Sequence, residues 1–67
     1  MKNSKEVLSS LLKTTQMGQI GIRSVLDVQM KPELRKEMES QLRELDFIES
    51  EAHAIARNRN WALPELN

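Results

Sequence analysis

Two copies of the tripeptide Pro-Glu-Leu set the organisation of this chain, because each has the composition of a helix start. Proline is well placed at the first position of a helix and disfavours helix at the residue before it. The first copy, residues 32–34, therefore separates two helical segments. The second copy, residues 64–66, is followed by one residue only. It predicts the start of a third helix that is missing, so that an apolar face is left to be covered.

The segment before Pro32 has the spacing of one long helix. Asn3 and Glu6 fit a capping box at its start. Beyond them, a stripe of residues follows steps of three and four, apolar at both ends and polar in the middle. Its members are Leu8, Leu11, Leu12, Thr15, Gln19, Ile22, Leu26 and Gln29. The pattern predicts a helix over about residues 4–29.

Two glycines, Gly18 and Gly21, lie inside this predicted helix. Each costs about 1 kcal/mol relative to alanine in a helix interior. The favoured interpretation is that they allow another helix to pack closely, because the residues beside them are also small or β-branched. The alternative is a kink at this point.

The segment from Pro32 onward predicts a second helix, over about residues 32–58, and then a short tail over residues 59–67. Asn58 and Asn60 suit a left-handed helix end, and Trp61 is placed to fold back over the last turn. The stripe of this helix is Leu34, Met38, Gln41, Leu42, Leu45, Ile48, Ala52, Ile55 and Ala56, and its opposite face carries Arg35, Lys36, Glu39, Arg43 and Asp46. A short link between two long helices predicts an all-α, antiparallel two-helix hairpin that forms a single domain.

The size of the chain favours association. In a chain of fewer than about 70 residues, the hydrophobic core rarely supplies more than ~3–5 kcal/mol of stability, so disulfides, a bound metal or a partner chain are usually needed as well. The 67 residues include no cysteine and one histidine, which excludes disulfides and thiolate metal sites. The remaining source of additional stability is a partner chain. We therefore expect a homodimer that forms a four-helix bundle, or pairing with a related helical protein.

The charge pattern excludes several other classes of protein. Ten basic and ten acidic residues are interspersed along the chain, so no basic stripe is present to bind nucleic acid. No apolar run approaches the roughly 20 residues that a membrane span requires. The N-terminus lacks the apolar core of a signal peptide, and the cytoplasm is the expected location.

Glu49 and His53 are the candidate metal ligands. They are one helical turn apart at the edge of the second apolar stripe, and a carboxylate and an imidazole at this spacing can reach one iron or zinc ion. The first helix offers Gln16 and Gln19 where further carboxylates would be needed, so the ligand set is incomplete. The favoured alternative is a Glu–His pair on the helix surface at the rim of the core, or a Glu49 that is hydrogen-bonded to Gln19 or Gln41. No other cofactor is expected.

No catalytic arrangement is visible in the sequence. The single histidine lacks an evident serine partner, and the two glycines do not form a phosphate-binding loop. We therefore expect the protein not to be an enzyme.

Several apolar residues lie off both stripes and predict a partner-facing surface. The alternative is that they are ordinary exposed apolar side chains. Met17, Ile20, Val28 and Phe47 would be exposed on a simple hairpin. Together with the glycines and the tryptophan they give the predicted interface: Met17, Gly18, Ile20, Gly21, Phe47 and Trp61.

Three segments resemble a known kind of protein. Residues 11–22, residues 31–35 and residues 41–44 are similar to small ferritin-like helical proteins of Firmicutes, and the second helix resembles that of the spore coat protein F family. Asn60-Trp61 stands where that family has a glycine-tryptophan pair. The resemblance implies the first hairpin of a ferritin-like four-helix bundle, and the spore as a second location. It implies architecture and not iron chemistry.

The predicted function is that of a structural or interaction protein that acts through helical self-association. In the predicted bundle, a polar layer of Thr15, Gln19, Gln41 and Glu49 crosses the middle and sets the register of the helices. The alternative function is a metal-binding ferritin-like bundle that uses Glu49 and His53.

Overall fold

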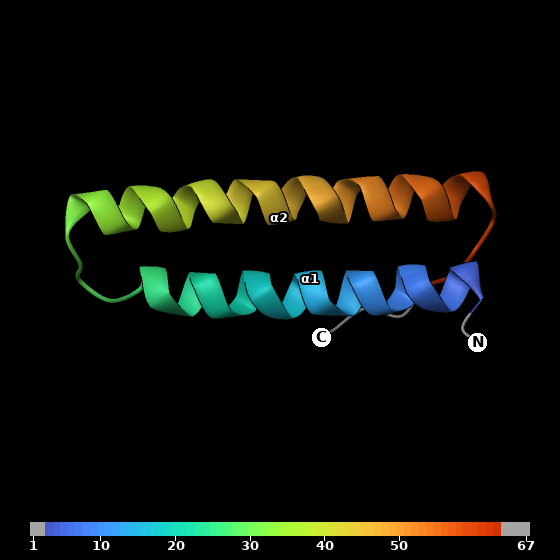
Figure 1. Cartoon of the computed structure of the whole chain (residues 1–67), viewed down its shortest axis with the longest axis horizontal. Coiled ribbons are helices and arrows are strands. Elements are labelled where there is room, and N and C mark those ends of the chain that lie inside the picture. Colours follow the sequence, from blue (N-terminus) through green and yellow to red (C-terminus); the bar gives the residue numbers. More distant parts are fainter. Residues whose placement is uncertain (1–2, 64–67) are drawn as a thin grey trace.

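A computed structural model describes residues 3–63, which form two antiparallel α-helices joined by a short turn (Figure 1). Helix α1 spans Ser4–Leu26 and helix α2 spans Pro32–Asn58. The described residues contain no strand, so the predicted all-α hairpin is confirmed. The second Pro-Glu-Leu, residues 64–66, lies outside the described residues, and the third-helix prediction stays a prediction.

Local sequence explains how both helices begin. Asn3 has an extended backbone, and its Oδ1 accepts a hydrogen bond of 2.8 Å from the Glu6 backbone N–H. This contact satisfies one of the free N–H groups at the start of α1, which confirms Asn3 as the cap. At α2, Lys31 is extended, Pro32 is the first helical residue, and Glu33 places a negative charge near the positive helix end.

The end of α1 differs from the prediction, because the helix ends at Leu26 and not near residue 29. The Asp27 and Val28 N–H groups donate to carbonyls three residues back, a tighter pattern that ends a helix. The Arg35 guanidinium then donates to the Leu26 carbonyl at 2.9 Å and to the Val28 carbonyl at 3.3 Å. Placing Arg35 on the outward charged face was therefore wrong, since its side chain reaches back and caps the end of α1.

The end of α2 is a Schellman motif, in which the last carbonyls accept hydrogen bonds from the residues after the helix. Asn60 adopts a φ of 57°, and its N–H donates to the Arg57 carbonyl at 3.2 Å. The Trp61 N–H donates to the Ala56 carbonyl at 2.8 Å. The predicted left-handed residue is thus Asn60, while Asn58 is the last residue of α2. The predicted return of Trp61 over the last turn is confirmed.

This motif predicts opposite effects for two substitutions at one position. Asn60→Ala should lower the free energy of unfolding by about 1 kcal/mol, because a Cβ without a local polar partner is strained at positive φ. Asn60→Gly should leave stability unchanged or raise it slightly, because glycine adopts this conformation freely. Urea unfolding followed by circular dichroism checks both variants. Equal stability of the two would contradict the role of Asn60.

The apolar core occupies one end of the hairpin. Leu8 and Leu12 of α1 are buried against Ala52 and Ala56 of α2, and Leu12 is fully covered. Two residues that follow α2 pack partly over this cluster, Trp61 and Leu63. Figure 1 shows how the chain after α2 turns back toward the start of α1. The residues after α2, Trp61 and Leu63, therefore cover the core at the open end of the hairpin in addition to the two helices.

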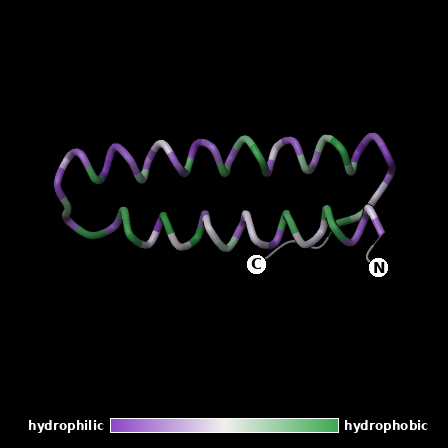
Figure 2. Tube along the Cα trace, in the orientation of Figure 1, coloured by the Kyte–Doolittle hydropathy of each residue, from purple (hydrophilic) through white to green (hydrophobic). Residues whose placement is uncertain are grey.

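The buried residues in the middle of the hairpin are polar. Thr15, Gln16 and Gln19 are all buried in the middle of α1. The Thr15 hydroxyl donates a hydrogen bond of 2.7 Å to the Leu11 carbonyl, one turn earlier in α1. This buried hydroxyl therefore needs no partner from α2. In Figure 2, α2 is the more hydrophilic helix, and much of its length is purple. The hairpin thus has a short apolar core followed by a polar centre.

The two glycines have different surroundings. A Cβ added to Gly18 would lie 3.1 Å from Leu45 Cδ1, so α2 packs closely on α1 at this point. Gly21 has no heavy atom within 4 Å of such a Cβ. Helix α1 continues through both positions. Close packing, the favoured interpretation, is confirmed for Gly18 within the hairpin, while the hairpin does not use the space beside Gly21.

Candidate functional site

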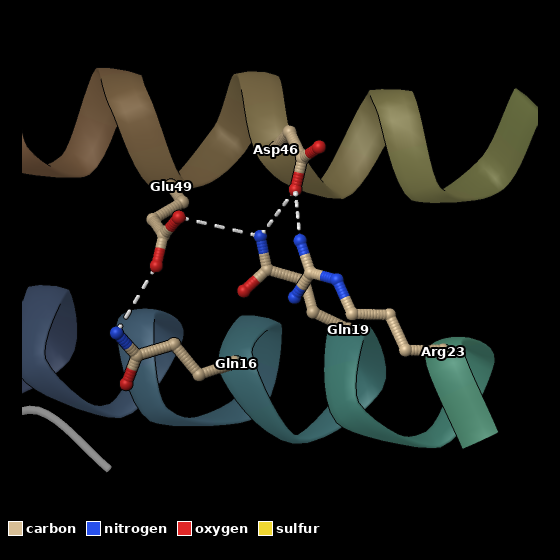
Figure 3. A network of polar contacts seen from close by, with 5 residues as sticks. All are labelled: Gln16, Gln19, Arg23, Asp46 and Glu49. Carbon is tan, nitrogen blue, oxygen red and sulfur yellow. Dashed lines mark hydrogen bonds and ion pairs between the residues drawn. The ribbon is translucent and has the colours of Figure 1, made fainter. Parts of the chain in front are cut away.

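A polar network joins the two helices at the middle of the hairpin (Figure 3). Helix α1 contributes Gln16, Gln19 and Arg23, and helix α2 contributes Asp46 and Glu49. Steps of three and four residues place the members of each helix on one flank. The network therefore follows directly from the helical spacing of its five residues.

Three hydrogen bonds run from the glutamine amides of α1 to the carboxylates of α2. Gln16 Nε2 donates to Glu49 Oε2 at 3.1 Å. Gln19 Nε2 donates to Asp46 Oδ1 at 2.7 Å and to Glu49 Oε1 at 3.4 Å. Arg23 adds an ion pair of 3.6 Å with Asp46 Oδ1. Among the described residues, every buried side-chain nitrogen and oxygen has a hydrogen-bond partner.

Gln19 holds the centre of this network. Its side chain is 3% exposed, and its amide nitrogen lies between two carboxylates that are one turn apart on α2. A charge-assisted hydrogen bond is about twice as strong as a neutral one. The Arg23–Asp46 pair contributes less, because both side chains are about half exposed and water screens their charges. The buried amide is therefore the main polar link between the helices.

The environment of Glu49 favours its charged form. The hydrogen bond from Gln16 is the largest cause of a lowered pKa for the Glu49 carboxyl. Partial burial acts in the opposite direction, while the Gln19 hydrogen bond and the nearby His53 and Arg23 lower the pKa further. Glu49 thus acts as an anionic acceptor at neutral pH.

This lowered pKa predicts a stability that depends on pH. Ionised Glu49 stabilises the fold above its unfolded pKa, and this contribution is lost as the pH falls through the lower pKa of the folded state. Glu49→Gln should therefore be less stable than the parent protein at neutral pH, and the difference should shrink on acidification. Thermal melts over a pH series check this. The control is Glu51→Gln at a neighbouring exposed position, and identical pH profiles for both variants would contradict the role of Glu49.

The polar layer predicted from sequence is correct in part. Gln19 does bond Glu49, which confirms the favoured interpretation of that glutamate. Gln41 is exposed, so its placement in the layer is wrong. Asp46 was assigned to the outward charged face and instead accepts from Gln19, because it lies at the edge of the stripe one turn before Glu49. Gln16 is a further partner, marked in the sequence only by its step of three to Gln19.

The predicted metal ligands lie within or beside this network. Both carboxylate oxygens of Glu49 accept amide hydrogen bonds, and His53 is half-buried one turn further along α2. Among residues 3–63, no group of three or more histidine, aspartate or glutamate side chains is arranged to hold a metal ion. The structure thus brings Glu49 together with two glutamines.

The predicted interface residues are spread over the hairpin surface. Met17, Ile20, Val28 and Phe47 are exposed, as predicted for residues off the two stripes. Gly21 is also exposed, Gly18 is partly covered by Leu45, and Trp61 is half-buried.

A pocket of about 290 Å³ lies between the start of α1 and the end of α2. The Arg59 guanidinium lies over the Trp61 ring, 5.2 Å from its centre, and forms one wall. The other walls are mainly apolar, and the lining is Ser4, Val7, Leu8, Leu11, Ile55, Arg59 and Trp61. The sequence signal that could have found this pocket is the four-residue step from Val7 to Leu11 beside the returning tryptophan.

Neither described helix is long and apolar enough to cross a membrane. No family model matches the chain, and no curated protein and no solved structure matches it.

Proposed function

We propose that this protein is a non-enzymatic structural or interaction protein, and that its activity is the self-association of the hairpin into a four-helix bundle. The observation that carries the proposal is the amount of surface that one hairpin leaves open. A folded monomer of 7.8 kDa is expected to expose about 4,400 Å². This chain exposes 5249 Å², or roughly 850 Å² more.

The shape of the chain supports the same proposal. Its radius of gyration is 14.1 Å, whereas a compact domain of this length has a value of about 11 Å. Its dimensions of 42 × 22 × 17 Å are those of two helices side by side. A second hairpin would supply the further layer that a two-layer helical domain normally has.

The distribution of apolar side chains also supports association. Among the described residues, the buried apolar core consists of four side chains, of which two are alanines. Nine large apolar side chains of the described residues are exposed: Val7, Leu11, Met17, Ile20, Val25, Val28, Leu34, Phe47 and Ile55. Burial of such surface is worth about 25 cal/mol per Å². A partner chain therefore stabilises the hairpin by covering part of this set.

Dilution tests the proposal. If folding depends on association, helical circular dichroism and the melting temperature should both fall as the protein is diluted. Light scattering on the same samples should show the loss of the larger species together with the loss of helix. A melting temperature that does not change with concentration, in a monomeric sample, would contradict the proposal.

Two further predictions from the sequence stay predictions. The spore coat resemblance is one of them, and it adds a cellular setting to the proposed assembly. Metal binding through Glu49 and His53 is the other. Metal analysis of the purified protein with a Glu49→Ala control decides it, and stoichiometric iron or zinc that is lost on substitution would favour the metal-binding function.

A further inference from the structure

We infer that the second copy of the chain packs on one particular side of the hairpin, which we name the apolar face. The inference rests on the proposed self-association and adds the surface that carries it. The apolar face is formed by residues of both helices: Val7, Leu11, Gly18 and Val25 of α1, with Leu34, Ile48 and Ile55 of α2.

The first observation is that the two sides of the hairpin differ in polarity. The polar network joins the helices on one side, through Gln16 and Glu49 among others. An α-helix turns by about 100° per residue, so Leu11 lies about 140° around α1 from Gln16. In the same way, Ile55 lies about 120° around α2 from Glu49. The pocket, which both Leu11 and Ile55 line, shows that these two flanks meet on the side opposite the network.

The second observation is a seven-residue spacing on this side of both helices. In α1, steps of seven connect Leu11, Gly18 and Val25. In α2, steps of seven connect another set: Leu34, Gln41, Ile48 and Ile55. This spacing is typical of a helix that packs along a neighbouring helix in a left-handed bundle. Such a stripe drifts by only ~20° per heptad, so it stays on one side of a helix of this length.

The third observation is the exposure of the apolar side chains. Five of the nine exposed large apolar residues belong to the apolar face, and their exposed fractions run from 41% for Ile55 to 55% for Val7. Of the other four, Ile20 and Val28 are 54% and 57% exposed, and Met17 and Phe47 are the most exposed at 65% and 66%.

Met17 and Phe47 do not share a surface with the apolar face. Phe47 follows Leu45, which packs on Gly18 of α1, by two residues and thus points about 200° away from it. Met17 has the same relation to the buried Thr15. The two residues therefore lie on opposite outer surfaces of the hairpin. Gly21 has this relation to the buried Gln19 and lies on the outer surface as well. Of the interface predicted from sequence, Gly18 and Trp61 therefore lie on or beside the apolar face, and the other four residues do not.

The surface that the hairpin leaves open is large enough for an interface with a second copy of the same chain. A standard interface covers about 800 Å² on each partner, and the whole hairpin exposes roughly 850 Å² more than a compact monomer of its mass. The pocket at one end of the face, about 290 Å³, is larger than the ~150 Å³ cavity that holds a benzene ring. It can therefore receive an apolar side chain of the partner.

Charge substitutions test the location of the interface. Leu11→Lys and Ile55→Lys place a charge on the apolar face, and Met17→Lys and Phe47→Lys are the matched controls on the outer surfaces. Sedimentation of all four should show association weakened at least tenfold for the first pair and changed less than twofold for the controls. Face variants that associate like the parent would overturn the inference while leaving self-association in place. A folded, monomeric parent protein would instead overturn the proposed function.

A second measurement avoids variants that fail to fold. The chain has no cysteine, so a single introduced thiol can be followed by its rate of alkylation. The Val25→Cys thiol should react several times more slowly as the protein concentration rises and the dimer forms. The Phe47→Cys thiol should react at a constant rate. A Val25→Cys thiol that stays equally reactive throughout an observed dimerisation would overturn the apolar face as the interface.

Discussion

Leu12→Ala should leave the protein largely unfolded at room temperature. Leu12 is the one large side chain of the described residues that is fully buried, and it packs in a cluster that contains only one other leucine. Removing a buried leucine side chain costs about 2–5 kcal/mol. A core of this size rarely supplies more than ~3–5 kcal/mol in total. Circular dichroism at 222 nm, with urea titration where helix persists, measures the loss.

The matched control is Ile20→Ala, which removes an exposed side chain from the same helix. Ile20 belongs neither to the core nor to the apolar face, so this variant should change stability by less than about 1 kcal/mol. If Leu12→Ala and Ile20→Ala are equally stable, Leu12 is not the centre of the core.

Gln19→Glu should have the next largest effect, a loss of about 3 kcal/mol at neutral pH. The substitution keeps the shape of the side chain but replaces the amide donor with a carboxylate that faces Asp46 and Glu49. Two nearby negative charges and burial both raise the pKa of the new carboxyl in the folded state. A raised folded pKa makes the loss small below the unfolded value of about 4.3 and larger as the pH rises.

Urea unfolding at acidic and neutral pH measures this effect. Gln29→Glu is the control, because it makes the same chemical change at an exposed position in the turn between the helices. Gln19→Glu that is as stable as Gln29→Glu at neutral pH would contradict the central place of Gln19 in the network.

The hairpin itself could be predicted from sequence because its determinants are local. Pro32 and the Asn3 cap begin the two helices, and Asn60 ends the second one. Each of these residues acts on backbone groups within a few positions of itself. The three- and four-residue steps of apolar residues then predicted the facing sides of the helices in part. Leu12 and Ala52 are buried between the helices, whereas Leu11, Leu34 and Ile55 of the same stripes are exposed.

The residues whose positions were wrongly predicted from sequence make contacts that depend on how the two helices pack against each other. Asp46 and Arg35 look like surface charges in a helical pattern, yet one accepts from Gln19 and the other caps α1. The pattern of α1 also continues to Gln29, although the chain must turn back after Leu26 in order to reach Pro32. These contacts join residues of different helices, and the spacing within one helix carries no information on them.

The apolar face could be recognised only once the hairpin was in view. In the sequence, Val7 is an apolar residue outside both stripes, and Leu34 and Ile55 belong to the stripe that is predicted to face α1. The pocket brings Val7, Leu11 and Ile55 to one side, and the network occupies the other. The difference in polarity between the two sides of the hairpin therefore arises only when the two helices are paired.

Sedimentation equilibrium of the parent protein over several decades of concentration tests the central claim most directly, because it measures mass without any variant. We expect a folded species of twice the 7.8 kDa chain mass, with helix lost as this species dissociates. A fully helical species of 7.8 kDa at every concentration would contradict the claim that a second copy completes the fold.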